Sequence, residues 1–115
     1  MRILFADDDN SQLEILKKWS VLKGYDARFA TNGREVLEIY NAEGFDLAVL
    51  DIDMPEIDGI TVAEELTKIN PEMKIIILTG LLPNLETSLP SGIRKVLIKP
   101  VSLSKLSEEI SNLAQ

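Results

Sequence analysis

Short runs of apolar residues alternate along this chain with longer stretches in which apolar residues recur every three or four positions. The short runs are apolar at nearly every position, which is the pattern of parallel strands covered on both faces. They predict five strands: "ILFA" 3–6, "ARFA" 27–30, "LAVL" 47–50, "IIIL" 75–78 and "KVLI" 95–98.

The stretches between these strands place their apolar residues on one face of a helix. They predict helices over 11–23, 32–42, 59–69 and 102–114. The predicted core faces comprise Leu13, Leu16, Trp19 and Leu22 in the first helix, Val36, Leu37 and Tyr40 in the second, Val62, Ala63, Leu66 and Ile69 in the third, and Leu103, Leu106, Ile110 and Leu113 in the last.

Polar residues and glycines near the helix ends are typical of caps. Asp9 is a predicted N-cap of the first helix, and Ser11 with Glu14 also has the spacing of a capping box. Asp58 could cap the helix over 59–69, and Gly24 is expected to end the first helix.

The segment between the last two strands departs from the regular alternation. It reads "GLLPNLETSLPSGIRKVLI", and Pro83 and Pro90 enclose only six residues. Because proline is poorly tolerated beyond the first turn of a helix, we expect a fourth helix that is short or irregular.

Strands that alternate with helices, without hairpin signals, indicate an α/β fold with one parallel sheet and right-handed crossovers. The 115 residues are enough for a single domain over 1–115. In sheets of this kind, ligands bind beyond the carboxyl ends of the strands, near the point where the strand order reverses.

Chemically active side chains follow four of the five predicted strands. They are Asp7, Asp8 and Asp9 after the first strand, Asp51 and Asp53 after the third, Thr79 after the fourth and Lys99 after the fifth. Only Thr31 and Asn32 follow the second strand. If the strand order is 2-1-3-4-5, the four strands with active side chains are neighbours and the second lies at an edge.

This grouping favours a magnesium site that handles phosphate. Carboxylates crowded together repel one another, and Mg²⁺ is bound by one or two carboxylates together with water and phosphate oxygens. A metal ion, a lysine and a hydroxyl around a carboxylate make a site for phosphoryl transfer. The carboxylate itself can be the nucleophile and form an acyl phosphate.

Composition excludes several other chemistries. The chain has no cysteine and no histidine, so thiolate metal sites, a Ser-His triad and a phosphohistidine are ruled out. Twelve basic and nineteen acidic residues give a net charge of -7, which disfavours direct binding to nucleic acid or to an anionic membrane. No apolar run is long enough to span a membrane, and "MRILFADDD" is no secretory signal, so we expect a cytoplasmic protein without membrane insertion.

Along its whole length the chain resembles the receiver domain of two-component response regulators. The matching pieces are "ILFADDD", "DLAVLDIDMPEIDG", "IIILTG" and "VLIKP", in the order and near the spacing of that family. The resemblance implies a flavodoxin-like, doubly wound fold with strand order 2-1-3-4-5. It also implies a signalling role rather than that of a conventional enzyme.

The resemblance also assigns a role to each residue at the strand ends. Asp51 matches the phosphoacceptor, which takes its phosphoryl group from the phosphohistidine of a sensor histidine kinase or phosphotransfer protein. Asp8 matches the main acidic ligand of Mg²⁺, and Asp7 its partner. Asp53 holds the position whose backbone carbonyl binds the metal.

The remaining two positions concern the switch. Thr79 matches the hydroxyl that moves to the phosphoryl oxygen, and Lys99 matches the lysine that pairs with the phosphoryl group. The bond from Lys99 to Pro100 is cis in the family. Val96 is a departure, because the family usually has an aromatic residue there, and Val96 has no ring to rotate. The downstream effector is not indicated by the sequence.

Two other functions compete with a phosphorylated receiver. "LDIDMP" fits the start of the signature of haloacid-dehalogenase-like phosphatases, but Pro55 replaces the required Thr or Val. A phosphorylation-independent interaction module on the same fold would fit Val96 and the weak fourth helix, but would leave the acidic site unexplained.

Overall fold

One five-stranded parallel sheet forms the centre of the computed structural model, which describes residues 1–54, 56–80 and 92–114. The strands are β1 (Arg2–Ala6), β2 (Asp26–Ala30), β3 (Leu47–Asp51), β4 (Lys74–Thr79) and β5 (Ile93–Ile98). Their order in the sheet is β2-β1-β3-β4-β5, and every neighbouring pair is parallel. The predicted fold class and strand order are confirmed.

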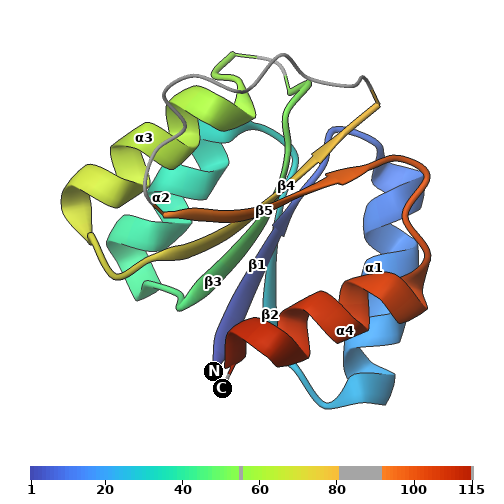
Figure 1. The fold of residues 1–115 in the computed structure, drawn as a ribbon. Helices are drawn as coiled ribbons and strands as arrows, with labels where there is room; N and C mark the ends of the chain where they lie inside the picture. The colour runs from blue at the N-terminus through green and yellow to red at the C-terminus, as the bar shows by residue number, and fades with distance from the viewer. Residues whose placement is uncertain (55, 81–91, 115) are drawn as a thin grey trace.

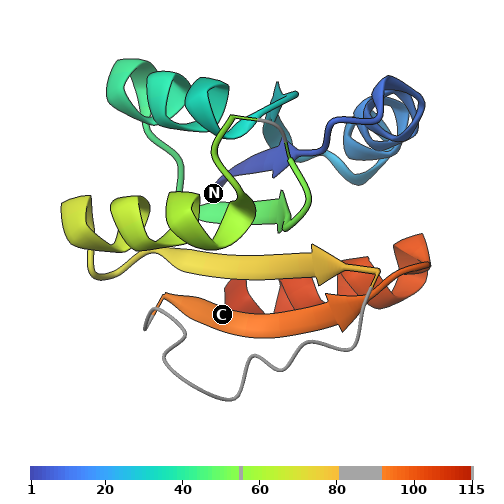
Figure 2. The same ribbon diagram turned by 90° about the horizontal axis from the view of Figure 1, so that it is seen from above.

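Helices cover both faces of this sheet. They are α1 (Asn10–Lys23), α2 (Gly33–Glu43), α3 (Gly59–Ile69) and α4 (Leu103–Ala114), the last being the helix predicted over 102–114. Figures 1 and 2 show α2 and α3 on one face and α1 with α4 on the other. The short helix predicted between Pro83 and Pro90 falls outside the described residues.

Two apolar cores lie on the two sides of the sheet because successive side chains of a strand point to opposite faces. In β1, Leu4 and Ala6 pack toward α2 and α3, whereas Ile3 and Phe5 belong to the core under α1 and α4. All five residues of β3 are buried. The near-continuous apolar runs in the sequence are therefore explained by a sheet covered twice.

The first helix is capped by Asp9, whose carboxylate accepts a hydrogen bond of 2.9 Å from the backbone N–H of Ser11. The capping box predicted for Ser11 and Glu14 is wrong, because α1 already begins at Asn10 and Ser11 lies inside its first turn. Gly24 ends the helix with φ 74°, in the left-handed region that favours glycine.

Two residues predicted for the core are on the surface. Leu22 is 85% exposed. Residues three positions apart in an α-helix are rotated about 60° short of a full turn, so the three such steps from Leu13 to Leu22 lead to the opposite side of the helix. Ser20 is buried instead. Ile69 is the last residue of α3 and is 54% exposed, so the packed face of that helix ends at Leu66.

The remaining predicted helix faces are at least partly buried. Trp19 packs against the core under α1 and α4, with its ring edge-on to Phe5 and Tyr25 at centroid distances of 6.3 and 5.4 Å. None of the helices in the described part of the chain is long and apolar enough to cross a membrane.

Candidate functional site

The carboxyl ends of four neighbouring strands meet at one edge of the sheet. Asp51 is the last residue of β3 and Thr79 the last of β4, while Asp7 directly follows β1 and Lys99 directly follows β5. The strand register pairs Asp51 with Leu78 and Thr79 with Ile98. Residues separated by up to about 90 positions are thus brought to one place by the order of the strands.

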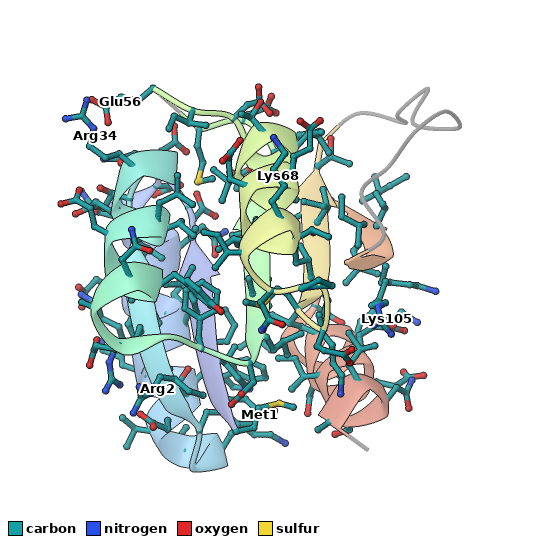
Figure 3. All side chains as sticks on the ribbon, turned by 90° about the vertical axis from the view of Figure 1, so that its left-hand side faces the viewer. Met1, Arg2, Arg34, Glu56, Lys68 and Lys105 are labelled. Carbon is teal, nitrogen blue, oxygen red and sulfur yellow. The ribbon has the colours of Figure 1, made fainter. Side chains whose placement is uncertain are left out.

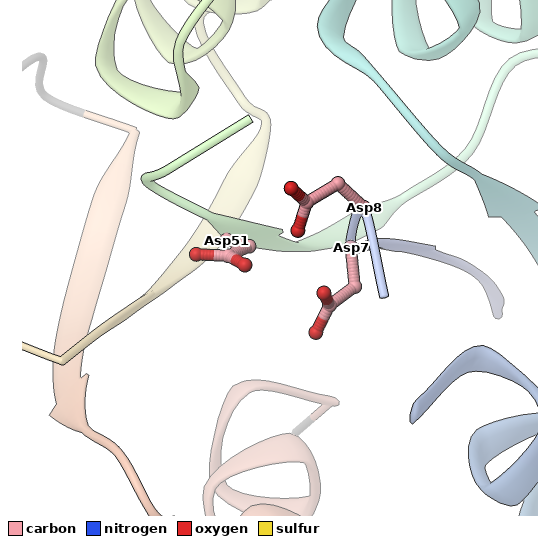
Figure 4. A group of neighbouring side chains, drawn as sticks. All are labelled: Asp7, Asp8 and Asp51. Atoms are coloured by element: carbon pink, nitrogen blue, oxygen red, sulfur yellow. The ribbon is translucent and has the colours of Figure 1, made fainter. Parts of the chain in front are cut away.

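Three carboxylates form the centre of this site. Asp7, Asp8 and Asp51 each offer an oxygen atom, and these oxygens lie within 4.8 Å of one another. Asp51 is 2% exposed and Asp7 is 6% exposed, whereas Asp8 is exposed. In Figure 4 the side chains of Asp7 and Asp8 leave the end of β1 toward different sides, and Asp51 faces them from β3.

Lys99 neutralises part of this negative charge. Its Nζ donates a hydrogen bond of 2.7 Å to Oδ2 of Asp51, and 36% of its side chain is exposed. Burial by itself lowers the pKa of Lys99, but the hydrogen bond to Asp51 and the charges of Asp51, Asp7 and Asp8 outweigh it, so the pKa is raised. The lysine therefore stays charged at neutral pH.

The second oxygen of Asp51 is bound to the backbone. Oδ1 accepts a hydrogen bond of 3.1 Å from the N–H of Asp53. Because both oxygens have donors, the carboxylate is held in one orientation. The side chain of Asp53 is exposed and does not belong to the group of three carboxylates found among the described residues.

Asp7 is also oriented by a backbone N–H, but its surroundings disfavour the ionised carboxylate. Its Oδ1 accepts a hydrogen bond of 2.9 Å from the N–H of Asp9. Burial raises the pKa of Asp7, and the charges of Asp51 and Asp8 add to this effect, although the Asp9 N–H and Lys99 oppose it. An ionised Asp7 therefore costs stability in the absence of a cation.

Thr79 and Lys99 are connected through the main chain. The N–H of Lys99 donates a hydrogen bond of 2.7 Å to the carbonyl oxygen of Thr79, and Thr79 is buried. The peptide bond between Lys99 and Pro100 is cis. Both residues are thus placed beside the Asp51 strand end, where the sequence predicted them.

Two glycines that the sequence analysis passed over shape the loop after Asp51. A Cβ atom at Gly59 would lie 2.7 Å from the carbonyl oxygen of Asp51, and one at Gly33 would lie 2.3 Å from the carbonyl oxygen of Ile57. Only glycine permits approaches this close. The available signal was the position of each glycine directly after a helix-capping residue, Asp58 or Asn32.

The donor set fits a hard divalent cation. Three carboxylate oxygens within 4.8 Å, one of them on an exposed side chain, leave room for water molecules and a phosphate-bearing partner, which is how Mg²⁺ is commonly bound. The lysine supplies a second positive charge at the same carboxylate. A buried, oriented carboxylate beside these groups can attack a phosphoryl group.

Comparison with known proteins agrees with this geometry. Residues 3–111 match the family model described as the response regulator receiver domain. The chain is 38% identical to the response regulator receiver protein CpdR of Brucella abortus, over 97% of this chain and 95% of CpdR. Some curated relatives are longer, and the chain spans 45% of one and 25% of another.

Solved structures are similar over almost the whole chain. A CheY-like receiver domain protein of Methanospirillum hungatei has a TM-score of 0.89 and 35% identity, covering 98% of this chain and 93% of that one. The response regulator TrrA of Thermotoga maritima, solved in complex with Mg²⁺-BeF, has a TM-score of 0.87 and 33% identity, with 97% of each chain covered.

Proposed function

This chain belongs to the response regulator receiver domain family, and on that basis we propose that it is a signalling module whose Asp51 accepts a phosphoryl group from a partner. Similarity to the receiver domain family implies that the donor is the phosphohistidine of a sensor histidine kinase or phosphotransfer protein. The absence of histidine from this chain fits a donor on another protein. Phosphorylation then changes a surface that a downstream effector recognises.

The observation that carries this proposal is the contact of Asp51 with Lys99. A buried carboxylate whose Oδ2 lies 2.7 Å from an ammonium group is a nucleophile beside the cation that would hold a transferred phosphoryl group. The N–H of Asp53 orients the same carboxylate through Oδ1. Lys99 and this N–H thus hold the Asp51 carboxylate in one orientation.

Mg²⁺ is the proposed cofactor. Asp8 and Asp51 would hold it directly, Asp7 would help as the buried partner, and Asp53 would contribute its backbone carbonyl. Mg²⁺ bound there supplies positive charge that offsets the negative charge of the phosphoryl group and of the three carboxylates. The complex of TrrA with Mg²⁺-BeF supports this assignment by similarity.

Thr79 and Lys99 are the proposed switch residues. Both stand at adjacent strand ends and are joined by a main-chain hydrogen bond, which fixes the position of one relative to the other. The Thr79 hydroxyl would bind a phosphoryl oxygen, and Lys99 would move its ion pair from Asp51 to the phosphoryl group. The same groups would serve autodephosphorylation, so the chain acts on itself and not as a conventional enzyme.

The test is modification by acetyl phosphate. With millimolar Mg²⁺, the intact mass of the protein should rise by one phosphoryl group, and chelation of the metal should prevent the rise. The variant Asp51→Asn should not be modified, while Asp53→Asn, whose side chain is exposed, should still react. Undiminished labelling of Asp51→Asn would show that the acceptor is a different residue.

Two further outcomes identify the competing functions. Failure of Asp51 in the folded wild-type protein to react with acetyl phosphate and Mg²⁺ would favour a phosphorylation-independent interaction module. If the protein hydrolyses p-nitrophenyl phosphate through many turnovers, it is an aspartate-nucleophile phosphatase.

A further inference from the structure

A cavity of about 390 Å³ opens between α1 and α4, at the same edge of the sheet as the carboxylates. Its walls are mostly apolar and come from four segments: Leu16 of α1, Leu78 of β4, Val101 before α4, and Leu103 and Leu106 of α4. A volume of this size and an apolar lining with few polar groups are typical of sites for small molecules.

Two of the three polar residues that line this cavity belong to the phosphoryl site, and the third is Gln12 of α1. The two are Asp7 and Lys99, and Lys99 is the residue that contacts Asp51. Asp51 is not among the lining residues. The cavity therefore adjoins two side chains that lie next to the acceptor carboxylate.

Resting on the proposed function, we infer that this cavity receives the apolar leaving group of a small phosphodonor, so that the chain prefers acyl phosphates with a larger apolar acyl group. The phosphoryl end of such a donor would lie at Asp51, with the Lys99 ammonium group moved from the carboxylate to a phosphoryl oxygen. Its hydrocarbon end would then leave water for the surface of Leu16, Val101 and Leu103.

The charges of the cavity agree with this placement. An acyl phosphate has its negative charge at the phosphoryl end, where Lys99 lies, and its acyl end is neutral. The walls formed by α1 and α4 contribute Leu16, Leu103, Leu106 and Gln12, all of them uncharged. A charged or strongly hydrated leaving group would lose hydration there, and besides the two residues of the phosphoryl site only the Gln12 amide could replace it.

The reaction is a displacement at phosphorus. A carboxylate oxygen of Asp51 forms the new P–O bond as the bond between phosphorus and the acyl oxygen breaks. The leaving carboxylate takes the electron pair and needs no proton. One mixed anhydride is exchanged for another, so the chemistry is the same for every aliphatic acyl group and any preference arises from binding.

The experiment compares acetyl, propionyl and butyryl phosphate with the full chain and millimolar Mg²⁺. The acids released by these donors are of nearly equal strength, and the intrinsic reactivity of each donor at phosphorus is measured separately from its uncatalysed hydrolysis at neutral pH, which breaks the same P–O bond. We expect the second-order rate constant of modification to rise from acetyl to butyryl phosphate by between about four- and fifteenfold. Each methylene that is fully buried contributes about fourfold.

Two variants test whether the preference for butyryl phosphate arises in the cavity. Val101 and Leu103 are partly buried, and the replacements Val101→Thr and Leu103→Asn keep the size of the side chain while making it polar. Each should lower the ratio of butyryl to acetyl rates at least twofold. Ile15→Asn is the matched control, because Ile15 is exposed on α1 and does not line the cavity; it should keep the wild-type ratio.

The outcomes separate this inference from the proposed function. Equal rates for all three donors, with Asp51 modified each time, would overturn the leaving-group cavity and leave the receiver function standing. A butyryl preference that survives both cavity variants would also overturn it. If no donor modifies Asp51, the proposed function fails and the inference fails with it.

Discussion

At the scale of single residues, the site depends on a balance between buried carboxylates and one lysine. Asp51 and Asp7 are both nearly inaccessible to water, but only Asp51 has an ammonium group at 2.7 Å. Burying an ionised carboxylate is costly unless a partner compensates it. Asp7 has a backbone N–H as its hydrogen-bond donor, and burial with the neighbouring acids raises its pKa.

The variant Asp7→Asn should therefore stabilise the protein when no divalent cation is present. A folded-state pKa above the usual 3.8 means that the contribution of Asp7 to stability is present below that pH and is lost as the pH rises through the folded pKa. At pH 7 the free energy of unfolding should increase by about 0.5–2 kcal/mol, as for other single stabilising substitutions. Urea unfolding with a chelator present measures it.

The same measurement at pH 3 and with a control variant tests the cause. At pH 3 both the wild-type side chain and the amide are neutral, so the difference should largely vanish. Glu108→Gln removes one negative charge at an exposed position of α4 and should change stability little. An equal gain for Glu108→Gln would assign the effect to net charge instead of to the burial of Asp7.

At the scale of elements, the loop between β3 and α3 connects the acceptor to a helix. The N–H of Gly59 donates a hydrogen bond of 3.1 Å to the carbonyl oxygen of Ile52, and Gly59 has no side chain to hold the loop away from Asp51.

The same loop contacts α2 through an ion pair. Nε of Arg34 lies 3.9 Å from Oε2 of Glu56, and Figure 3 shows the two side chains together. Glu56 has a φ of 69°, which is uncommon for a residue other than glycine.

Asp58 ends this loop and starts α3. Its Oδ1 accepts hydrogen bonds of 2.9 Å from the N–H groups of both Ile60 and Thr61. The variant Asp58→Ala should lower the free energy of unfolding by about 1 kcal/mol, because these N–H groups lose their cap. Thermal or urea unfolding measures the change. Asp58→Asn keeps an acceptor oxygen and should cost much less, so an equal loss for both variants would contradict a capping role.

At the scale of the whole molecule, the parallel sheet brings together charges that repel one another until a cation binds. The chain has a net charge of -7, and three of its carboxylates lie within 4.8 Å. A ligand that binds only the folded state stabilises it by mass action. Stability and metal binding should therefore be linked across the molecule.

Millimolar Mg²⁺ should raise the melting temperature of the protein. At ten times the dissociation constant the gain is about 1.4 kcal/mol, which corresponds to a shift of roughly 3–8 °C for a domain of this size. Calorimetry at pH 7 with and without the metal measures the shift. No shift in the wild type would contradict the proposed metal site.

Two variants separate the roles of neighbouring acids in this response. Asp8→Ala should remove most of the metal-dependent shift and should itself stabilise the metal-free form by relieving repulsion. Asp53→Ala should keep the shift, because the proposed contribution of Asp53 is its backbone carbonyl and its side chain is exposed. Loss of the shift in Asp53→Ala would mean that this carboxylate binds the metal.

The amino-acid sequence by itself determined the elements and their chemistry. Apolar runs and helical spacing depend on local burial, so the strands and helices of the described residues were predictable to within a few positions. Asp7, Asp51, Thr79 and Lys99 could be placed at one edge, because parallel strands all carry their carboxyl ends on the same side. The sequence pattern also indicated the family.

Only the tertiary structure decided which groups meet. The ion pair of Lys99 with Asp51 joins residues 48 positions apart, and the close approach of Gly59 to Asp51 depends on how the loop folds back. The burial of Ser20 on the packed side of α1 also depended on which side of the helix the sheet covers. Local patterns specify burial and backbone preference, whereas distances between separate segments arise from strand order, register and packing, which no single segment contains.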